Sequence, residues 1–364
     1  MFLSGGGMLG IYHIGVVKTL HQTDALPNII AGSSAGSLLA ALVAARRDDE
    51  LSTDLANLDF LYHLFEAKHH HTSTWDKFLK LMRRGYIYEH EDYLPMIEGA
   101  TRGLTFSEAF KRSGRTLCIT CTPSGSNLSG IVLNHLNAPD VLISTAVLAS
   151  MRLPGLYPPV CLREKRSFSE EGGRLSKTSA ASNRLRQRRA SGTSMTQLLK
   201  FSDGSLHHDV PIDILRESLG IRFAIVSQVN PHVVPFFQAG SFAQQHWQFF
   251  HRIPWYFGEC MRMRARIVRN LGFKPRVAGI DLFHVITQTY HGDVTILPSS
   301  MATFNDYLGV LDSLSSKDEL DKKIRLAETL TSEHSLIWAR MRIQRAVQRF
   351  VDHHHSYPFW RRPF

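Results

Sequence analysis

The chain has 364 residues, an ordinary globular composition and a formal net charge of +10. No apolar run reaches the roughly 18 residues of a membrane span, and no basic region followed by an apolar core opens the chain, so the sequence predicts neither a transmembrane anchor nor secretion. Its four cysteines do not suggest a disulfide framework for so long a chain, which favours a reducing compartment.

Most of the positive charge lies in one segment. From Arg163 to Lys200 there are ten Lys and Arg against three Glu, so this segment carries +7 of the +10. It is rich in Ser, Gly and Ala and nearly free of apolar residues, which predicts a disordered basic insert over residues 164–199. A nucleic-acid binder is a weak alternative, because the charge is confined to this insert and no aromatic platform accompanies it.

The chain opens with a short strand, residues 2–3, then a glycine loop, Gly5-Gly6-Gly7-Met8-Leu9-Gly10, and a helix over 11–22. Successive glycines let backbone N–H groups turn toward one point, as in an anion nest. A nucleotide phosphate loop is disfavoured because the lysine of GxxxxGK[ST] is missing, and a plain turn remains an alternative. We interpret the loop as an oxyanion hole, with Gly5, Gly6, Gly7 and Met8 as candidate donors.

The second motif, Gly32-Ser33-Ser34-Ala35-Gly36, has the GxSxG pattern and lies between an apolar strand-like run, 29–31, and a helix-forming run, 37–45. This strand–turn–helix context is the one in which GxSxG forms a nucleophile elbow. The turn lifts Ser34 clear of the backbone, and the small Gly32 and Gly36 let strand and helix approach closely. The helix start also directs N–H groups toward charge that develops near Ser34. We therefore interpret Ser34 as a nucleophile.

Residues 48–104 have a helical pattern, with leucines at helical spacing: Leu51, Leu55, Leu58, Leu61 and Leu64. That stripe is typical of helices packed on a core. His69-His70-His71 invites a metal site, but no carboxylate or histidine at matching helical spacing completes one, so we expect no metal. Thr105 and Glu108 have the spacing of a capping box, which predicts a short helix ending at Arg112.

Strand-like runs follow at residues 116–121 and 130–133, and then a helix over about 140–150. Alternating strands and helices predict an α/β layered fold. Cys118 and Cys121 lie three residues apart on the first of these strands, so we expect them on opposite faces of the sheet. That placement disfavours a metal or redox role for the CxxC pair.

His135 and Asp140 match the HxxxxD pattern associated with lysophospholipid acyltransferases. Such a pair would be a histidine base oriented by a carboxylate. The match is only two residues long, and Asp140 precedes an apolar run where it serves equally well as a helix N-cap. Both interpretations stay open at the level of sequence.

Three motifs in order, Gly5 to Gly10, Gly32 to Gly36 and Asp203-Gly204, resemble the patatin-like phospholipase family. Two later runs, 227–236 and 292–298, are similar to its triacylglycerol lipase branch, the lipid-droplet enzymes of fungi and plants. The resemblance covers roughly residues 2–300. It implies a three-layer α/β/α sandwich with a mostly parallel central sheet. The amino-terminal extension usual in that branch is not present in this sequence, and the basic insert separates motif blocks that normally lie closer.

Asp203 follows a strand-like run, 198–201, and an aspartate before glycine is most often a turn residue. A serine nucleophile requires a base, however. In the family that this chain resembles, the aspartate of the DG motif is that base, without the histidine of a triad. The resemblance therefore implies a dyad of Ser34 and Asp203, with no metal or cofactor. We expect the neighbouring His207 and His208 on the solvent side.

Beyond residue 230 the signals are weaker. Residues 236–274 interleave aromatic residues with arginines, which suits either a membrane interface or a helix packed on the sheet. Residues 318–349 have the pattern of charged helices. We expect an acyl-hydrolase domain over residues 1–300 and a helical tail over 301–364.

The resemblance implies acylglycerol or phospholipid substrates, triacylglycerol first, and a peripheral location at an intracellular lipid-droplet or endoplasmic reticulum surface. A phospholipase or acyltransferase of the same fold and a catalytically silent lipid-surface protein remain alternatives. We expect no specific nucleic acid as a partner, and the sequence does not indicate an oligomeric state.

Overall fold

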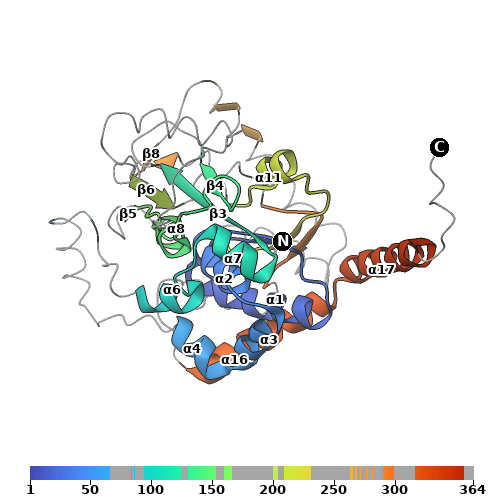
Figure 1. Ribbon diagram of the computed structural model, residues 1–364. Coiled ribbons are helices and arrows are strands. Elements are labelled where there is room, and N and C mark those ends of the chain that lie inside the picture. Colours follow the sequence, from blue (N-terminus) through green and yellow to red (C-terminus); the bar gives the residue numbers. More distant parts are fainter. Residues whose placement is uncertain are drawn as a thin grey trace, which may run out of the picture.

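A computed structural model describes the main body of the chain (Figure 1). The described residues are 1–65, 83, 86, 94–123, 130–152, 160–165, 200–203, 209–230, 263–264, 267–268, 271, 276–277, 280–281, 288, 290–298 and 316–355. For β6, β8 and β9, and for the end of the last helix, the description covers the backbone only. The basic insert and His69 to His71 lie outside the described residues.

An eight-stranded sheet forms the centre, with strand order β10-β7-β1-β2-β3-β6-β5 and β4 paired to β3. The five strands from β10 to β3 run parallel, whereas β4, β5 and β6 join by antiparallel pairing. The strands are β1 (Phe2–Leu3), β2 (Ile29–Gly32), β3 (Thr116–Pro123), β4 (Ile131–Leu133), β5 (Val160–Cys161), β6 (Lys200–Asp203), β7 (Ile225–Ser227) and β10 (Val294–Ile296). A separate hairpin pairs β8 (Arg276–Val277) with β9 (Ile280–Asp281).

Helices cover both faces of this sheet, which gives three layers (Figure 1). One face carries a larger set of helices, and α11 (Ile212–Leu219) packs on the other. The larger set comprises α1 (Tyr12–Gln22), α2 (Ala35–Ala44), α3 (Asp48–Ala56), α4 (Leu58–Phe65), α6 (Leu94–Thr101), α7 (Phe106–Ser113), α8 (Ile143–Ser150) and α16 (Lys317–Ser332). The mostly parallel three-layer sandwich expected from the sequence is confirmed.

Side chains of β3 alternate between the two cores, as the pleat of a strand requires. Cys121 packs in the core beneath α2 and α8, whereas Cys118 packs in the core beneath α11. The expected opposite orientation of the CxxC pair is confirmed. Burial raises the pKa of the Cys118 thiol to about 12, so this cysteine is an inert core residue.

Two strands pair with the same edge of β3, one after the other along its length. Ile119 pairs with Gly32 of β2 and with Leu133 of β4, so β2 and β4 lie on opposite edges. Cys121 pairs with β4 through Ile131 and with β6 through Asp203, so β4 and β6 also lie on opposite edges. Therefore β2 and β6 occupy the same edge of β3. Along that edge, the last residue of β6 pairs with a β3 residue two positions after the one that pairs with the last residue of β2.

The capping box over Thr105 is confirmed. Its side-chain oxygen accepts the Glu108 N–H at 3.2 Å and its own N–H donates to the Glu108 carboxylate at 3.0 Å, and α7 begins at the next residue. The helix expected to start at Asp140 is three residues shorter, because α8 begins at Ile143 with Leu142 as N-cap. The N-cap interpretation of Asp140 is therefore wrong.

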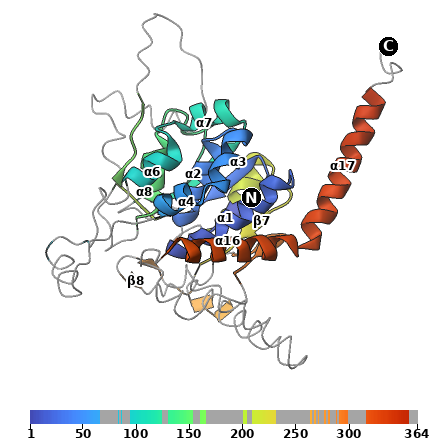
Figure 2. The same ribbon diagram turned by 90° about the horizontal axis from the view of Figure 1, so that it is seen from below.

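The predicted tail divides into two different helices. Helix α16 packs along α1, where Leu320, Ile324 and Ala327 are buried in the main core, so it is part of the domain (Figure 2). Helix α17 (Ser335–His355) contacts the body through its first part, where Ile337 is buried and the Arg340 guanidinium lies over the Phe223 ring, and then projects away (Figure 2). None of the described helices combines the length and hydropathy that a bilayer crossing needs.

Candidate active site

The GxSxG turn has the geometry of a nucleophile elbow. Ser34 follows β2 and caps α2 with φ 48° and ψ −125°, a left-handed conformation that costs a non-glycine residue free energy and recurs at functional sites. The turn closes because the backbones nearly touch: a Cβ on Gly32 would lie 2.4 Å from the Gly36 carbonyl oxygen. The Ser34 side chain is 9% exposed, and the Ser34 N–H donates to Ser150 Oγ at 3.0 Å.

The glycine loop lies beside this elbow. A 3₁₀ helix, η1 (Gly7–Ile11), continues the loop, and a Cβ on its Gly10 would lie 2.9 Å from the Ala35 Cβ at the start of α2. Gly7 and Met8 open η1, so their N–H groups have no partner within that helix and are available to an oxyanion. A Cβ on Gly6 would meet the Val229 carbonyl oxygen at 2.8 Å, which requires glycine there.

Gly5 differs from the sequence-based expectation. Its N–H donates to Asp209 Oδ1 at 2.8 Å, so this donor is engaged by the protein itself. The candidate oxyanion donors are therefore reduced to Gly6, Gly7 and Met8.

Asp209 connects the segments of the site, and the sequence analysis missed it. The residue is 1% exposed. Ser33 Oγ lies 2.6 Å from its Oδ1 and 2.9 Å from its carbonyl oxygen, and Asn230 Nδ2 donates to its Oδ2 at 3.0 Å. The Asp209 N–H donates to Gln288 Oε1 at 2.9 Å. These partners are far apart in sequence, so no local motif signals them.

Asp203 is the last residue of β6, and its backbone lies next to the elbow. Its partner on β3 is Cys121, which lies two residues after Ile119, the partner of Gly32. Two residues correspond to about 7 Å along a strand. The backbone of Asp203 therefore lies on the same edge of β3 as the elbow and directly beyond it. The structure describes the backbone of this residue only, whereas Gly204, His207 and His208 lie outside the described residues.

A buried histidine braces the base of the glycine loop, and it too was missed. His13 is 0% exposed, with Nε2 3.0 Å from the Ser4 carbonyl oxygen and Nδ1 2.7 Å from Ser227 Oγ. Because a carbonyl only accepts, Nε2 carries the proton and Nδ1 accepts from the hydroxyl. Burial lowers the pKa of His13 to about 4, against the Ser4 hydrogen bond, which raises it. The ring is therefore neutral at physiological pH.

The HxxxxD residues do not come together. His135 stacks on Phe110, with ring centroids 4.0 Å apart and planes 2° apart, and burial lowers its pKa. Asp140 is exposed, and its carbonyl oxygen accepts the Lys165 N–H at 2.9 Å. No hydrogen bond or ion pair joins the two side chains, both of which the structure describes. The carboxylate therefore does not orient this histidine as a base.

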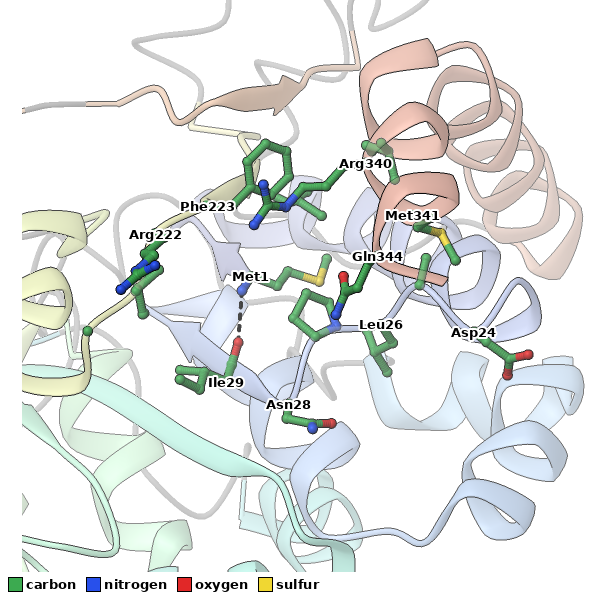
Figure 3. Close-up of a pocket in the computed structure, with 16 residues that line it drawn as sticks. Met1, Asp24, Leu26, Asn28, Ile29, Arg222, Phe223, Arg340, Met341 and Gln344 are labelled. Carbon is green, nitrogen blue, oxygen red and sulfur yellow. Dashed lines mark hydrogen bonds between the residues drawn. The ribbon is translucent and has the colours of Figure 1, made fainter. Parts of the chain in front are cut away.

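A pocket of about 600 Å³ lies at the opposite end of the strands (Figure 3). Its lining includes Met1 and Ile29, which lie at the amino ends of β1 and β2, together with Arg340 of α17. Ligands of open parallel sheets bind at the carboxyl ends of the strands, where Ser34 and the glycine loop lie. This pocket is therefore not the candidate active site.

Among the residues that the structure describes, no group of three or more His, Cys, Asp or Glu side chains is arranged to hold a metal ion. The site described above contains a serine, backbone donors and carboxylates. Groups of these kinds are the ones that nucleophilic acyl transfer uses.

Comparisons with known proteins give one consistent family. A family model described as patatin-like phospholipase matches residues 1–216. A patatin-like phospholipase domain-containing protein of Neosartorya fischeri is 33% identical over 359 residues, covering 95% of this chain and 46% of that protein. A protein of the same description from Cryptococcus neoformans is 31% identical, covering 95% of this chain and 38% of that protein. Another from Neurospora crassa is 36% identical, covering 85% of this chain and 34% of that protein.

The chain therefore spans less than half the length of these relatives. Among solved structures, VipD of Legionella pneumophila is 13% identical, with 90% of this chain and 66% of that chain covered and a TM-score of 0.35.

Proposed function

Because the chain belongs to the patatin-like phospholipase family, we propose that it is a serine lipid acyl hydrolase whose nucleophile is Ser34 and whose base is Asp203. The observation that carries this proposal is the succession of β2 and β6 on one edge of β3. This arrangement brings the backbone of Asp203 next to the elbow, although Asp203 lies 169 positions after Ser34 in the sequence. The strained φ of Ser34 supports the same proposal.

The reaction is a two-step acyl transfer. Asp203 accepts the Ser34 proton while Oγ bonds to the acyl carbonyl carbon, and the N–H groups of Gly6, Gly7 and Met8 stabilise the oxyanion. The ester C–O bond then breaks, and the leaving alcohol takes the proton from Asp203. Water attacks the acyl-enzyme in the second step, with Asp203 again accepting and returning a proton, and the fatty acid leaves.

We propose triacylglycerol as the first substrate, from the similarity of residues 227–236 and 292–298 to the lipase branch. Phospholipid is the second, because the relatives are described as containing a patatin-like phospholipase domain. Transfer of the acyl group to a lipid hydroxyl instead of water is a variant of the same chemistry.

A peripheral location at a lipid-droplet or endoplasmic reticulum surface belongs to the same proposal. The projecting helix α17 supports it. Leu336, Ile343 and Val347 recur at helical spacing on one face and are 51%, 65% and 56% exposed, and the helix also carries Arg340 and Arg342. Exposed apolar residues next to cationic ones suit an anionic lipid surface.

The test is fatty-acid release from emulsified triacylglycerol and from phosphatidylcholine vesicles, with Ser34→Ala and Asp203→Asn against wild type. Ser218→Ala and Asp213→Asn on the exposed face of α11 make the same chemical changes away from the site. We expect the first pair to lose at least about 1,000-fold in kcat and the control pair to stay within about two-fold. A folded Asp203→Asn variant with wild-type turnover would refute the assignment of the base.

A further inference from the structure

One buried carboxylate joins the glycine loop, the elbow and the segment that follows β7. Asp209 accepts the Gly5 N–H of the glycine loop and the Ser33 hydroxyl of the elbow through Oδ1, and the Asn230 amide through Oδ2. These partners come from the ends of three neighbouring strands, β1, β2 and β7. Both carboxylate oxygens are thus occupied within the protein.

Asp209 is also joined closely to the proposed base. It follows Asp203 by six residues, and β6 fixes the other end of this short connection by its pairing to β3. The chain between them is therefore held at both ends, by the sheet and by the carboxylate.

We propose that Asp209 is a positioning residue for the reaction, which holds the oxyanion loop, the nucleophile elbow and the segment after β7 in one arrangement. This inference rests on the proposed function. Asp209 is not a second base, because its oxygens are engaged by Gly5, Ser33 and Asn230. It acts through the backbone atoms and side chains that it holds, and it does not touch the reacting atoms.

The carboxylate is the right group because all three of its partners donate. In Asp209→Asn the amide oxygen keeps the Gly5 and Ser33 donors, but the new NH₂ faces the NH₂ of Asn230, and the two side chains can bond only if the Asn230 amide turns over. Exchanging the partner, Asp209→Asn with Asn230→Asp, restores one donor facing one acceptor. This exchange separates the hydrogen-bonding role of Asp209 from the mere presence of an aspartate at this position.

The experiment compares wild type, Asp209→Asn, the exchanged double variant and the control Asp213→Asn in steady-state hydrolysis of a soluble p-nitrophenyl ester. Asp213 is an exposed carboxylate on α11. A displacement of about 1 Å at a reacting group costs about 100-fold in rate. We expect Asp209→Asn to lose about 100-fold in kcat with KM within about three-fold, and the exchange to recover at least about ten-fold.

Amide hydrogen exchange over residues 2–12 and 29–40 reads the same arrangement without activity. We expect faster exchange at both segments in Asp209→Asn, slower exchange again in the double variant, and wild-type exchange in Asp213→Asn. Ser33→Ala removes one donor only and should change both readouts in the same direction by less, which keeps the test available if Asp209→Asn does not fold.

Wild-type kcat in folded Asp209→Asn would overturn the inference, and so would a loss of kcat that the exchange fails to recover while hydrogen exchange is unchanged. An inert wild type would instead refute the proposed function, and the hydrogen-exchange comparison would still decide whether Asp209 holds the two loops.

Discussion

At the scale of single residues, burial rather than sequence motif sets the chemistry around the site. His13 and Asp209 are both buried, and each bridges strands that are distant in sequence. The histidine stays neutral because charging it would place an unpaired cation in the core. Its hydrogen bonds to Ser4 and Ser227 use both ring nitrogens, so a second proton would also reverse the bond to Ser227, whose hydroxyl would have to accept instead of donate.

His13 should make stability depend on pH. The unfolded chain protonates this ring near pH 6.5 and the folded chain only near pH 4, so the unfolded state binds more protons between these values. Stability is therefore full above pH 6.5 and falls as the pH drops toward 4, by about 3 kcal/mol at about 1.4 kcal/mol per pKa unit.

The measurement is urea denaturation at pH 7, 5.5 and 4 with wild type and His13→Gln, which keeps a donor but does not titrate. The variant is expected to be less stable at pH 7, with the gap to wild type closing at pH 4. If the two free energies of unfolding fall in parallel with pH, His13 is not the titrating group.

At the scale of elements, close backbone contact fixes the join between strand and helix at the elbow. A Cβ on Gly36 would lie 2.3 Å from the Leu3 carbonyl oxygen, and neither backbone can move without disturbing β1. Gly99 of α6 is the opposite case, because its nearest neighbour would be Leu64 Cδ1 at 3.8 Å.

The same substitution should therefore have opposite effects at the two glycines. Gly36→Ala is expected to lower the free energy of unfolding by about 3 kcal/mol or more, the upper range of overpacking. Gly99→Ala is expected to raise it by about 0.5–1 kcal/mol, since alanine loses less entropy in a helix. Thermal and urea denaturation of both variants measures this, and a tolerated Gly36→Ala would mean that the elbow backbone is not tightly packed.

Local signals in the sequence predicted local structure well. The capping box at Thr105, the elbow glycines and the strand through Cys118 and Cys121 all depend on neighbours within a few residues. Asp140 fails as an N-cap because tertiary pairing decides where α8 starts: the Leu142 N–H donates to the Arg163 carbonyl oxygen. The role of Asp209 could not be predicted from local patterns, because the residues that donate to its side chain lie 204, 176 and 21 positions away.

At the scale of the whole molecule, the carboxyl-terminal part of the described chain completes the core around the first helix. Helix α16 packs against α1 so closely that a Cβ on Gly15 would lie 2.2 Å from the Ile324 carbonyl oxygen, and Lys18 pairs with Glu328 at 2.7 Å. The pattern of charged residues indicated helices there but did not indicate that the first of them is half-buried. The burial of α16 depends on the contact between its apolar stripe and α1.

Two isoleucines test this division between α16 and α17. Ile324 is 3% exposed and Ile343 is 65% exposed. Ile324→Ala should cost about 2–4 kcal/mol of unfolding free energy through lost burial and a cavity, whereas Ile343→Ala should stay within about 0.5 kcal/mol. Urea denaturation measures both. Equal costs would show that α16 is not part of the core.

The sheet as a whole brings the backbone of Asp203 next to the elbow, since β2 and β6 pair with the same edge of β3. The most direct measurement is covalent labelling with an alkyl fluorophosphonate, followed by peptide mass spectrometry. We expect one adduct, on Ser34, which forms at least about 100-fold more slowly in Asp203→Asn. A folded protein that takes no label, or takes it on another serine, would contradict the assignment of Ser34 as the nucleophile.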